Sequence, residues 1–266
     1  MHNFAKSIRA HALEMTYRAK ASHIGSCFSI AEILAVLYGS ILRIDPLYPK
    51  ALDRDRLIIS KGHAAASVYA ALALCGFFPL EQLKTFCESG SDLLGHVSHE
   101  VPGVEYSSGS LGHGLSIGCG MALAAKQSGE NFHTYVLLSD GELNEGSTWE
   151  AILFAGHHKL SSLTMIVDCN RMQALGATAD ILELEPLGKK LQACAWEVIE
   201  VDGHNEAFLE EALKKKSDKP KAVIGHTIKG KGIAYMENSL TWHYKNPTDL
   251  QASLEALELE KVATDH

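Results

Sequence analysis

Carboxylates gather in the stretch SDGELNEGSTWEA, residues 139–151, directly after the apolar run TYVLL. A second apolar run, LTMIVDC, ends at Asn170. Both runs are typical of central strands in a parallel sheet, where ligands bind at the carboxyl ends of the strands. A carboxylate, an amide oxygen and a backbone carbonyl are ligands that Mg²⁺ accepts. Asp140 and Asn170 are therefore candidate metal ligands, although Asp140 also suits a turn with Gly141 and Asn170 a strand-end cap.

Histidine is abundant, with 14 residues in the chain, and imidazole suits both proton transfer and metal binding. The spacings in HVSH and HH invite a zinc interpretation, but no carboxylate-histidine pattern of a metalloenzyme accompanies them. The run GSLGHG, residues 109–114, departs from the GxGxxG pattern, and no strand leads cleanly into it. Zinc and dinucleotide sites are therefore disfavoured.

An alternation of strand-like and helix-like segments would position these residues. The predicted strands are residues 56–60, 134–140, 163–170, 196–203 and 221–229. The predicted helices are residues 29–42, 114–126, 147–159, 205–216 and about 248–264. Ser29 and Glu32 have capping-box spacing for the first helix, and Thr248 is the expected cap of the last. This order predicts an α/β fold with three layers, a parallel sheet with helices on both faces, as a single domain over residues 1–266.

The composition and charge of the chain restrict which partners and which cellular compartment are expected for it. A net charge of −8 and a pI near 5.9 offer no broad positive surface, so nucleic acid and acidic membrane are unlikely partners. The N-terminus lacks the apolar core of a signal peptide and no apolar run is long enough to span a bilayer, which predicts a cytoplasmic protein. The 6 cysteines are scattered without a CxxC motif and are expected to be reduced and mostly buried.

Several blocks of the chain resemble the transketolase family in the same order. They are KASHIGSCFSIAEILAVLY, RDRLIISKGHAAASVYAAL, GHVSHEVPGVEYSSGSLGHGLSIGCGMALAAK, DGELNEGSTWEA and TIKGKG, and they cover most of residues 5–245. Asp140 and Gly141 followed by Asn170 resemble the thiamine-diphosphate fingerprint, in which GDG precedes an asparagine; here Ser139 replaces the first glycine. The resemblance implies a diphosphate-binding domain of the thiamine-diphosphate fold.

The same resemblance assigns roles to individual residues. Mg²⁺, or Ca²⁺ or Mn²⁺ in its place, would be held by Asp140, Asn170 and the main-chain carbonyl of Met172. Glu145 matches a glutamate at the subunit interface near the cofactor, whereas Glu142 and Glu150 are expected to be solvated or capping charges. The channel around the cofactor and the sugar donor would be lined by His23, His63, His96 and His243. Cofactor contacts would come from His63, Gly109, Leu111, Gly141, Glu145 and Asn170, with backbone groups around Leu111 meeting the aminopyrimidine.

Three positions near these motifs leave alternatives open. Lys229 and Lys231 in TIKGKG would lie near phosphates or form a solvated turn. His113 stands where transketolases generally carry glutamine, so backbone contacts there are expected and a side-chain role is not assigned.

The implied activity is ketol transfer, in which a two-carbon unit moves from a ketose or ketose phosphate to an aldose or aldose phosphate. A full transketolase is more than twice as long, so the chain resembles the N-terminal subunit of a split enzyme. A separate C-terminal transketolase-like subunit would supply the pyrimidine-binding domain, in an α₂β₂ assembly. The alternatives are a subunit of another thiamine-diphosphate enzyme, which joins 2-oxoacid-derived units, and a non-catalytic cofactor-binding scaffold.

Overall fold

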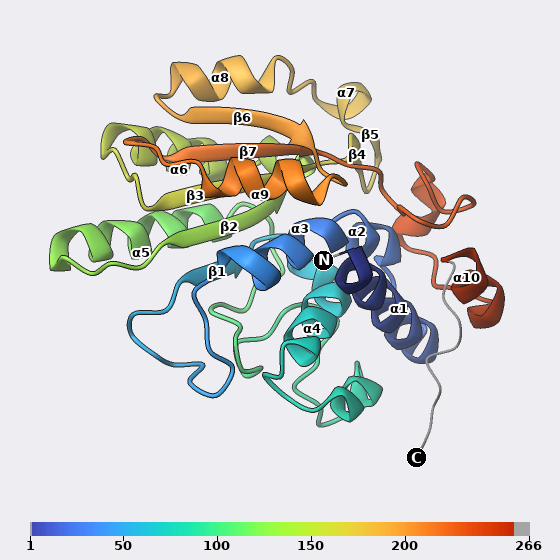
Figure 1. The fold of residues 1–266 in the computed structure, drawn as a ribbon. Coiled ribbons are helices and arrows are strands. Elements are labelled where there is room, and N and C mark those ends of the chain that lie inside the picture. The colour runs from blue at the N-terminus through green and yellow to red at the C-terminus, as the bar shows by residue number, and fades with distance from the viewer. Residues whose placement is uncertain (1, 258–266) are drawn as a thin grey trace.

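A computed structural model describes residues 2–257 of the chain, and its centre is a five-stranded parallel sheet (Figure 1). The strand order is β1-β2-β3-β7-β6, and every neighbouring pair is parallel. The strands are β1 (Arg56–Ile59), β2 (Thr134–Ser139), β3 (Leu163–Cys169), β6 (Glu197–Asp202) and β7 (Lys221–His226). A small antiparallel pair, β4 (Met172–Gln173) and β5 (Gly176–Ala177), follows β3.

Helices cover both faces of this sheet, as the alternating sequence pattern predicts (Figure 1). One layer contains α1 (His2–Ala19), α2 (Ile24–Phe28), α3 (Ala31–Val36), α4 (Ala65–Leu74) and α9 (Glu206–Lys214), with α10 (Leu250–Ala256) packed against α1. The other layer contains α5 (Gly114–Ser128), α6 (Gly146–His157) and α8 (Leu187–Ala193). The short α7 (Thr178–Ile181) follows β5.

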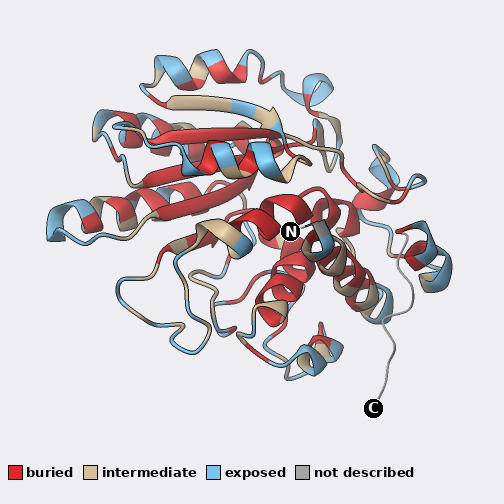
Figure 2. Ribbon diagram, viewed as in Figure 1, coloured by how far each residue is buried: buried red, intermediate tan, exposed pale blue. Residues whose placement is uncertain are grey.

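Successive residues of the central strands pack into two different cores, because side chains alternate between the faces of a strand. Leu137 of β2 belongs to the core beneath α1, α3 and α4, whereas its neighbours Val136 and Leu138 belong to the core beneath α5 and α6. All residues of β2 and β3 are buried (Figure 2). Continuous apolar runs such as TYVLL therefore reflect burial on both sides of the sheet.

Short 3₁₀ and π-helical turns connect several of these elements. They are η1 (Leu37–Ile41, π), η2 (Gly62–Ala64), η3 (Leu80–Thr85), η4 (Gly141–Asn144) and η5 (Leu240–His243). No helix within residues 2–257 is long and apolar enough to cross a membrane.

The predicted strands and helices are confirmed in position, but both predicted caps are wrong. Helix α3 begins at Ala31 with Ile30 at its N-cap. Glu32 does not close a capping box, because its carboxylate binds the Arg9 guanidinium through two 2.6 Å hydrogen bonds. Ser29 instead donates its hydroxyl to Asp168 Oδ2 at 2.7 Å.

The last helix is capped by Asp249 rather than Thr248. Asp249 Oδ1 accepts from the backbone N–H of Ala252 at 3.0 Å, which satisfies a free donor of the first turn of α10. Helix α10 ends at Ala256. The rest of the predicted segment, residues 258–264, lies outside the described residues.

Candidate functional site

A polar pocket of about 240 Å³ lies at the carboxyl ends of β2 and β3. Four histidines line it, His23, His63, His96 and His243. The other lining residues are Ser26, Lys61, Gly109, Leu111, Ser139, Gly141, Asn170, Met172, Gln173, Ala174 and Lys229. The structure therefore brings the predicted histidines, the loop 109–114 and the two strand ends into one site.

Two of the predicted metal ligands, Asn170 and Met172, line one corner of this pocket, and the third, Asp140, adjoins that corner without lining it. Ser139 pairs with Asp168 across β2 and β3, so Asp140 and Asn170 leave adjoining strands at the same edge. Asp140 Oδ1 accepts from Gly141 N at 2.8 Å and Oδ2 from Arg171 N at 2.5 Å. Asp140 is 2% exposed, and burial together with the charge of Asp168 raises its pKa to about 7.

Asp168 does not line the pocket, but its side chain forms hydrogen bonds with several residues around this corner. Its carboxylate is buried and accepts from Lys61 Nζ, Thr227 Oγ1, Ser29 Oγ at 2.7 Å and Asn170 Nδ2 at 2.9 Å. Burial alone would raise the pKa of Asp168, but Lys61 and the hydroxyl donors lower it below its usual value. The amide of Asn170 is thereby oriented, because its nitrogen is committed to Asp168 and its Oδ1 accepts from the backbone N–H of Met172 at 3.1 Å.

The histidines form a contiguous group around His23. The ring centroid of His23 lies 5.2 Å from that of His63, 5.8 Å from His96 and 5.3 Å from His243. Burial lowers the pKa of His23 to about 4 and that of His243 to about 3, and the charges of Lys229 and Lys61 act in the same direction. Burial and Lys61 also hold the pKa of His63 well below its usual value. These three imidazoles are therefore neutral near pH 7.

His243 reaches the group from a distant part of the chain. It lies on η5, and its carbonyl accepts from the backbone N–H of His23 at 3.0 Å. His23 has a left-handed backbone conformation with φ of 74°. A non-glycine residue rarely adopts this conformation, and here it accompanies a contact between two predicted site residues.

Two buried lysines place positive charge at the pocket. Lys61 and Lys229 are 0% and 2% exposed, and both line the pocket. Lys229 Nζ lies 2.8 Å from His243 Nδ1, and burial together with Lys61 lowers the pKa of Lys229 to about 8. The solvated-turn alternative is therefore wrong for Lys229, whereas Lys231 is a partly exposed residue whose ammonium lies 3.5 Å from Glu237.

Sequence reasoning missed Lys61 and Gln173 as pocket residues. Lys61 stands two positions before His63 in the SKGHA segment, so that motif was the available signal. Gln173 lies in β4, next to the predicted ligand Met172, and its Nε2 donates to Asn144 Oδ1 at 2.9 Å.

The prediction for Glu142 is wrong, because its side chain is buried and not solvated. The turn η4 begins immediately after β2 and places Glu142 beneath the loop 109–114, where Oε1 accepts from Ser60 Oγ and from Gly112 N at 2.8 Å. Burial raises the pKa of this carboxyl group.

Glu145 and Glu150 are exposed, and His113 is also exposed and does not line the pocket.

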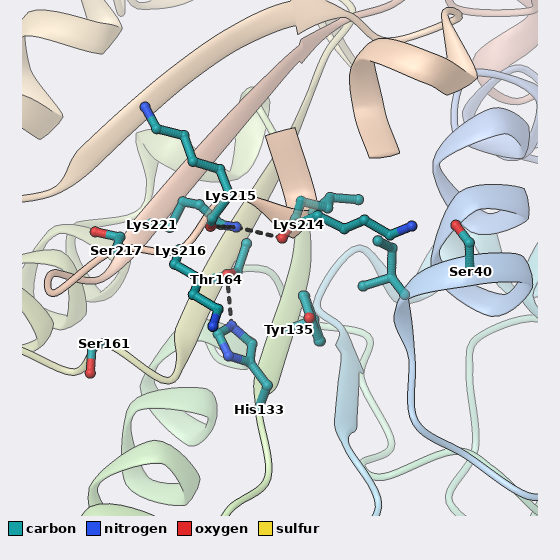
Figure 3. Close-up of a pocket in the computed structure, with 12 residues that line it drawn as sticks. Ser40, His133, Tyr135, Ser161, Thr164, Lys214, Lys215, Lys216, Ser217 and Lys221 are labelled. Atoms are coloured by element: carbon teal, nitrogen blue, oxygen red, sulfur yellow. Dashed lines mark hydrogen bonds between the residues drawn. The ribbon is translucent and has the colours of Figure 1, made fainter. Parts of the chain in front are cut away.

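A larger hollow of about 400 Å³ lies at the opposite, amino end of the strands (Figure 3). Several of its basic residues are engaged in structural contacts. Lys221 Nζ donates to the carbonyls of Ala212, Leu213 and Lys215 at the end of α9. Lys215 pairs with Glu197 at 2.8 Å, and His133 Nε2 lies 2.8 Å from Thr164 Oγ1. The carboxyl-end pocket is smaller but contains the residues suited to chemistry.

A family model described as "Transketolase, thiamine diphosphate binding domain" matches residues 1–252. The chain belongs to the transketolase family. It is 42% identical to an apulose-4-phosphate transketolase subunit of Phocaeicola vulgatus, over 90% of this chain and 86% of that protein. It is 40% identical to the 6-deoxy-6-sulfo-D-fructose transketolase subunit SqwG of Clostridium sp., over 97% and 95% of the two chains.

Solved transketolases confirm the predicted fold. The structure from Campylobacter jejuni superposes with a TM-score of 0.89 at 32% identity, covering 96% of this chain. The match covers only 41% of the Campylobacter chain. This chain therefore corresponds to the thiamine-diphosphate-binding part of a transketolase, which is a transferase, and the predicted family membership is confirmed.

The described residues fit the cofactor that the family implies. A carboxylate, an amide oxygen and a backbone carbonyl, from Asp140, Asn170 and Met172, are oxygen donors of the kind that Mg²⁺ prefers, and Asn170 and Met172 line the pocket. No group of three or more His, Cys, Asp or Glu residues within residues 2–257 is placed to hold a metal. The ammonium of Lys229 pairs with no carboxylate in the described part of the chain, and a diphosphate would supply negative charge beside it.

Proposed function

We propose that this chain is the cofactor-binding subunit of a two-component transketolase, which transfers a ketol unit from a ketose to an aldose. The observation that carries the proposal is the pocket at the ends of β2 and β3, which combines an oxygen donor set, buried lysines and neutral histidines. Relatives that are named as single subunits of sugar-specific transketolases, and that match this chain over most of their length, support it.

Mg²⁺ would be held by Asp140, Asn170 and the carbonyl of Met172. Lys229 is proposed to neutralise the diphosphate, with Lys61, which is paired with Asp168, beside it, and Gly109, Leu111 and Gly141 would offer backbone to the rest of the cofactor. When bound, thiamine diphosphate supplies the stabilised carbanion on which ketol transfer depends.

The histidines would exchange protons with the hydroxyl groups of the sugars. A neutral imidazole accepts a proton on one nitrogen while the other donates, so it can exchange protons with a hydroxyl as a carbon–carbon bond breaks or forms. His23, His63 and His243, which are neutral near pH 7, are proposed for this role, with His96 completing the channel. Burial of the pocket would exclude bulk water from these steps.

A second subunit would complete the site. The chain spans 41% of the solved transketolase from Campylobacter jejuni, whereas relatives that it matches over most of their length are named as single subunits. The exposed Glu145 is proposed to lie at a subunit interface. On the helix that follows it, Leu153 and Phe154 expose 59% and 39% of their surface, which suits an apolar contact. An α₂β₂ assembly in the cytoplasm is the expected form.

Calorimetric titration of thiamine diphosphate and Mg²⁺ tests this proposal. The chain is titrated alone and after mixing with a candidate partner subunit, and Asp140→Ala serves as the control. We expect binding that appears or strengthens on mixing and disappears in Asp140→Ala. Absence of binding under both conditions would refute the cofactor assignment and favour a scaffold role.

The sugar substrate is a separate question, because a partner subunit would contribute to acceptor recognition. Relatives are named for apulose 4-phosphate and for 6-deoxy-6-sulfo-D-fructose, so phosphorylated and sulfonated ketoses are both suitable donors to test. Ketol transfer from such a ketose by the assembled enzyme would support the proposal. Turnover only with 2-oxoacids would assign the chain to another thiamine-diphosphate reaction.

A further inference from the structure

The buried carboxylate of Glu142 connects two parts of the pocket wall. Its Oε1 accepts hydrogen bonds from Ser60 Oγ and from the backbone N–H of Gly112, the latter at 2.8 Å. Ser60 Oγ in turn accepts from the backbone N–H of Gly114 at 3.0 Å. One carboxylate therefore fastens two peptide groups of the loop 109–114, one directly and one through Ser60.

The same loop is held on its carbonyl side. Ser147 Oγ donates to the carbonyl of Gly112 at 2.8 Å, so both polar groups of this residue are bound by side chains of residues 142–147. Gly112 has a φ of +86°, and a Cβ there would lie 2.6 Å from Ser147 Oγ and 2.9 Å from Glu145 Cβ. The close approach of the two segments therefore requires glycine at this position.

The part of the loop that faces the pocket is free of such contacts. Gly109 and Leu111 line the pocket, and neither makes a backbone hydrogen bond to any residue among 2–257. Unpaired backbone groups beside a pocket are suited to binding a polar ligand. The loop thus combines a fixed anchor at Gly112 and Gly114 with available backbone groups at Gly109 and Leu111.

We propose that Glu142 is a positioning residue that, with Ser60 and Ser147, holds the loop 109–114 so that Gly109 and Leu111 present their backbone to the cofactor. This inference rests on the proposed function, because it requires that the pocket binds thiamine diphosphate. Burying a carboxyl group is costly unless it is hydrogen-bonded, and the bonds from Ser60 and Gly112 to Oε1 offset part of that cost, whereas Oε2 makes no hydrogen bond within residues 2–257. Glu142 touches no pocket space itself and acts through the loop.

Glu142→Leu and Glu142→Gln test this role by two measurements. Calorimetry measures the Kd of thiamine diphosphate with saturating Mg²⁺, with and without a candidate partner subunit. Hydrogen–deuterium exchange of the cofactor-free chain measures protection of residues 109–114. We expect Glu142→Leu to raise the Kd about tenfold and to speed exchange in the loop, because Gly112 N loses its acceptor and Ser60, which bonds Gly114 N, loses the carboxylate that orients its hydroxyl. Glu142→Gln keeps an acceptor oxygen and should retain most of the affinity.

A matched control separates positioning from general stability. Glu32 is also a buried glutamate, bonded to Arg9 and to His204, and it does not line the pocket. Glu32→Gln is expected to lower the melting temperature without raising the cofactor Kd. Should Glu142→Leu fail to fold, Ser60→Ala and Ser147→Ala remove individual anchors and are expected to change exchange and Kd in the same direction.

The outcomes distinguish this inference from the proposed function. Absence of cofactor binding by the wild-type chain in every mixture would refute the proposed function, and the inference with it. A wild-type chain that binds, together with a folded Glu142→Leu variant whose Kd stays within about twofold, would overturn the inference alone, whether or not the loop exchanges faster.

Discussion

Lys229 is the residue whose chemistry depends most on a bound anion. Its ammonium is buried, its hydrogen-bond partner is the neutral His243, and no carboxylate within residues 2–257 forms an ion pair with it. The lowered pKa of about 8 reflects the cost of holding a charge there beside Lys61. A diphosphate in the pocket would turn this unfavourable charge into a favourable one.

Lys229→Met should therefore separate cofactor affinity from stability. We expect the Kd of thiamine diphosphate to rise by about tenfold to a hundredfold, since a charge-assisted contact in a buried site is lost. The cofactor-free protein should melt at the same or a higher temperature, because an uncompensated buried charge is replaced by an apolar chain. Lys231→Met is the matched control. Equal effects of the two substitutions on Kd would contradict the assignment.

At the scale of elements, helix α5 packs closely against the sheet at a glycine, Gly118, which has no side chain. A Cβ on Gly118 would overlap Cγ2 of Val136 in β2, whereas a Cβ on Gly120 would meet nothing within 4 Å. The small residues that the sequence shows in this helix thus have different roles on its two sides. Those facing β2 permit close packing, and Gly120 lies on the exposed side.

Gly118→Ala and Gly120→Ala form a matched pair for this packing. Gly118→Ala is expected to destabilise the chain by about 1–3 kcal/mol, because an extra methyl group must displace a strand or a helix. Gly120→Ala should stabilise it by about 0.5–1 kcal/mol through higher helix propensity. Chemical denaturation of the isolated chain measures both. A similar loss in both variants would show that helix geometry, and not contact with Val136, decides the outcome.

The elements were largely predictable from the sequence, whereas several interactions between them were not. Strand β3 follows from its apolar run, but Asp168 within that run forms a buried ion pair with Lys61, 107 positions away in the sequence. From the sequence, Glu142 is expected to be a surface charge, because none of its neighbours in the sequence indicates that the loop 109–114 covers it. The predicted capping box at Ser29 and Glu32 does not form because Glu32 binds Arg9, and such a tertiary contact outweighs a local preference.

Across the whole molecule, several histidines are held neutral by burial. His133 is the clearest test, since it lies far from the proposed metal ligands, at the amino end of β2. Burial lowers its pKa to about 4, with a further contribution from Lys221. The unfolded chain, with a histidine pKa near 6.5, therefore binds more protons than the folded chain between these values.

This difference predicts that stability declines in acid. The contribution of His133 is fully present above about pH 6.5 and is lost as the pH falls towards about 4, by at most about 3 kcal/mol. Urea denaturation between pH 4 and 8 measures the decline. His133→Gln retains a polar partner for Thr164 but does not titrate, so its stability should fall less over the same range. Parallel curves for the two proteins would refute the assignment.

The strand order determines when each strand can pair with its neighbours during synthesis of the chain. Strand β6 pairs only with β7, and β7 also pairs with β3, although β7 follows β6 in the sequence. During synthesis on the ribosome, β6 therefore has no sheet partner until residues 221–226 have emerged. These residues then enter between two existing strands, and the chain beyond them carries Lys229 and His243 to the pocket. The binding site therefore cannot be complete until the chain up to His243 has been made, after helices α1 to α9 but before α10.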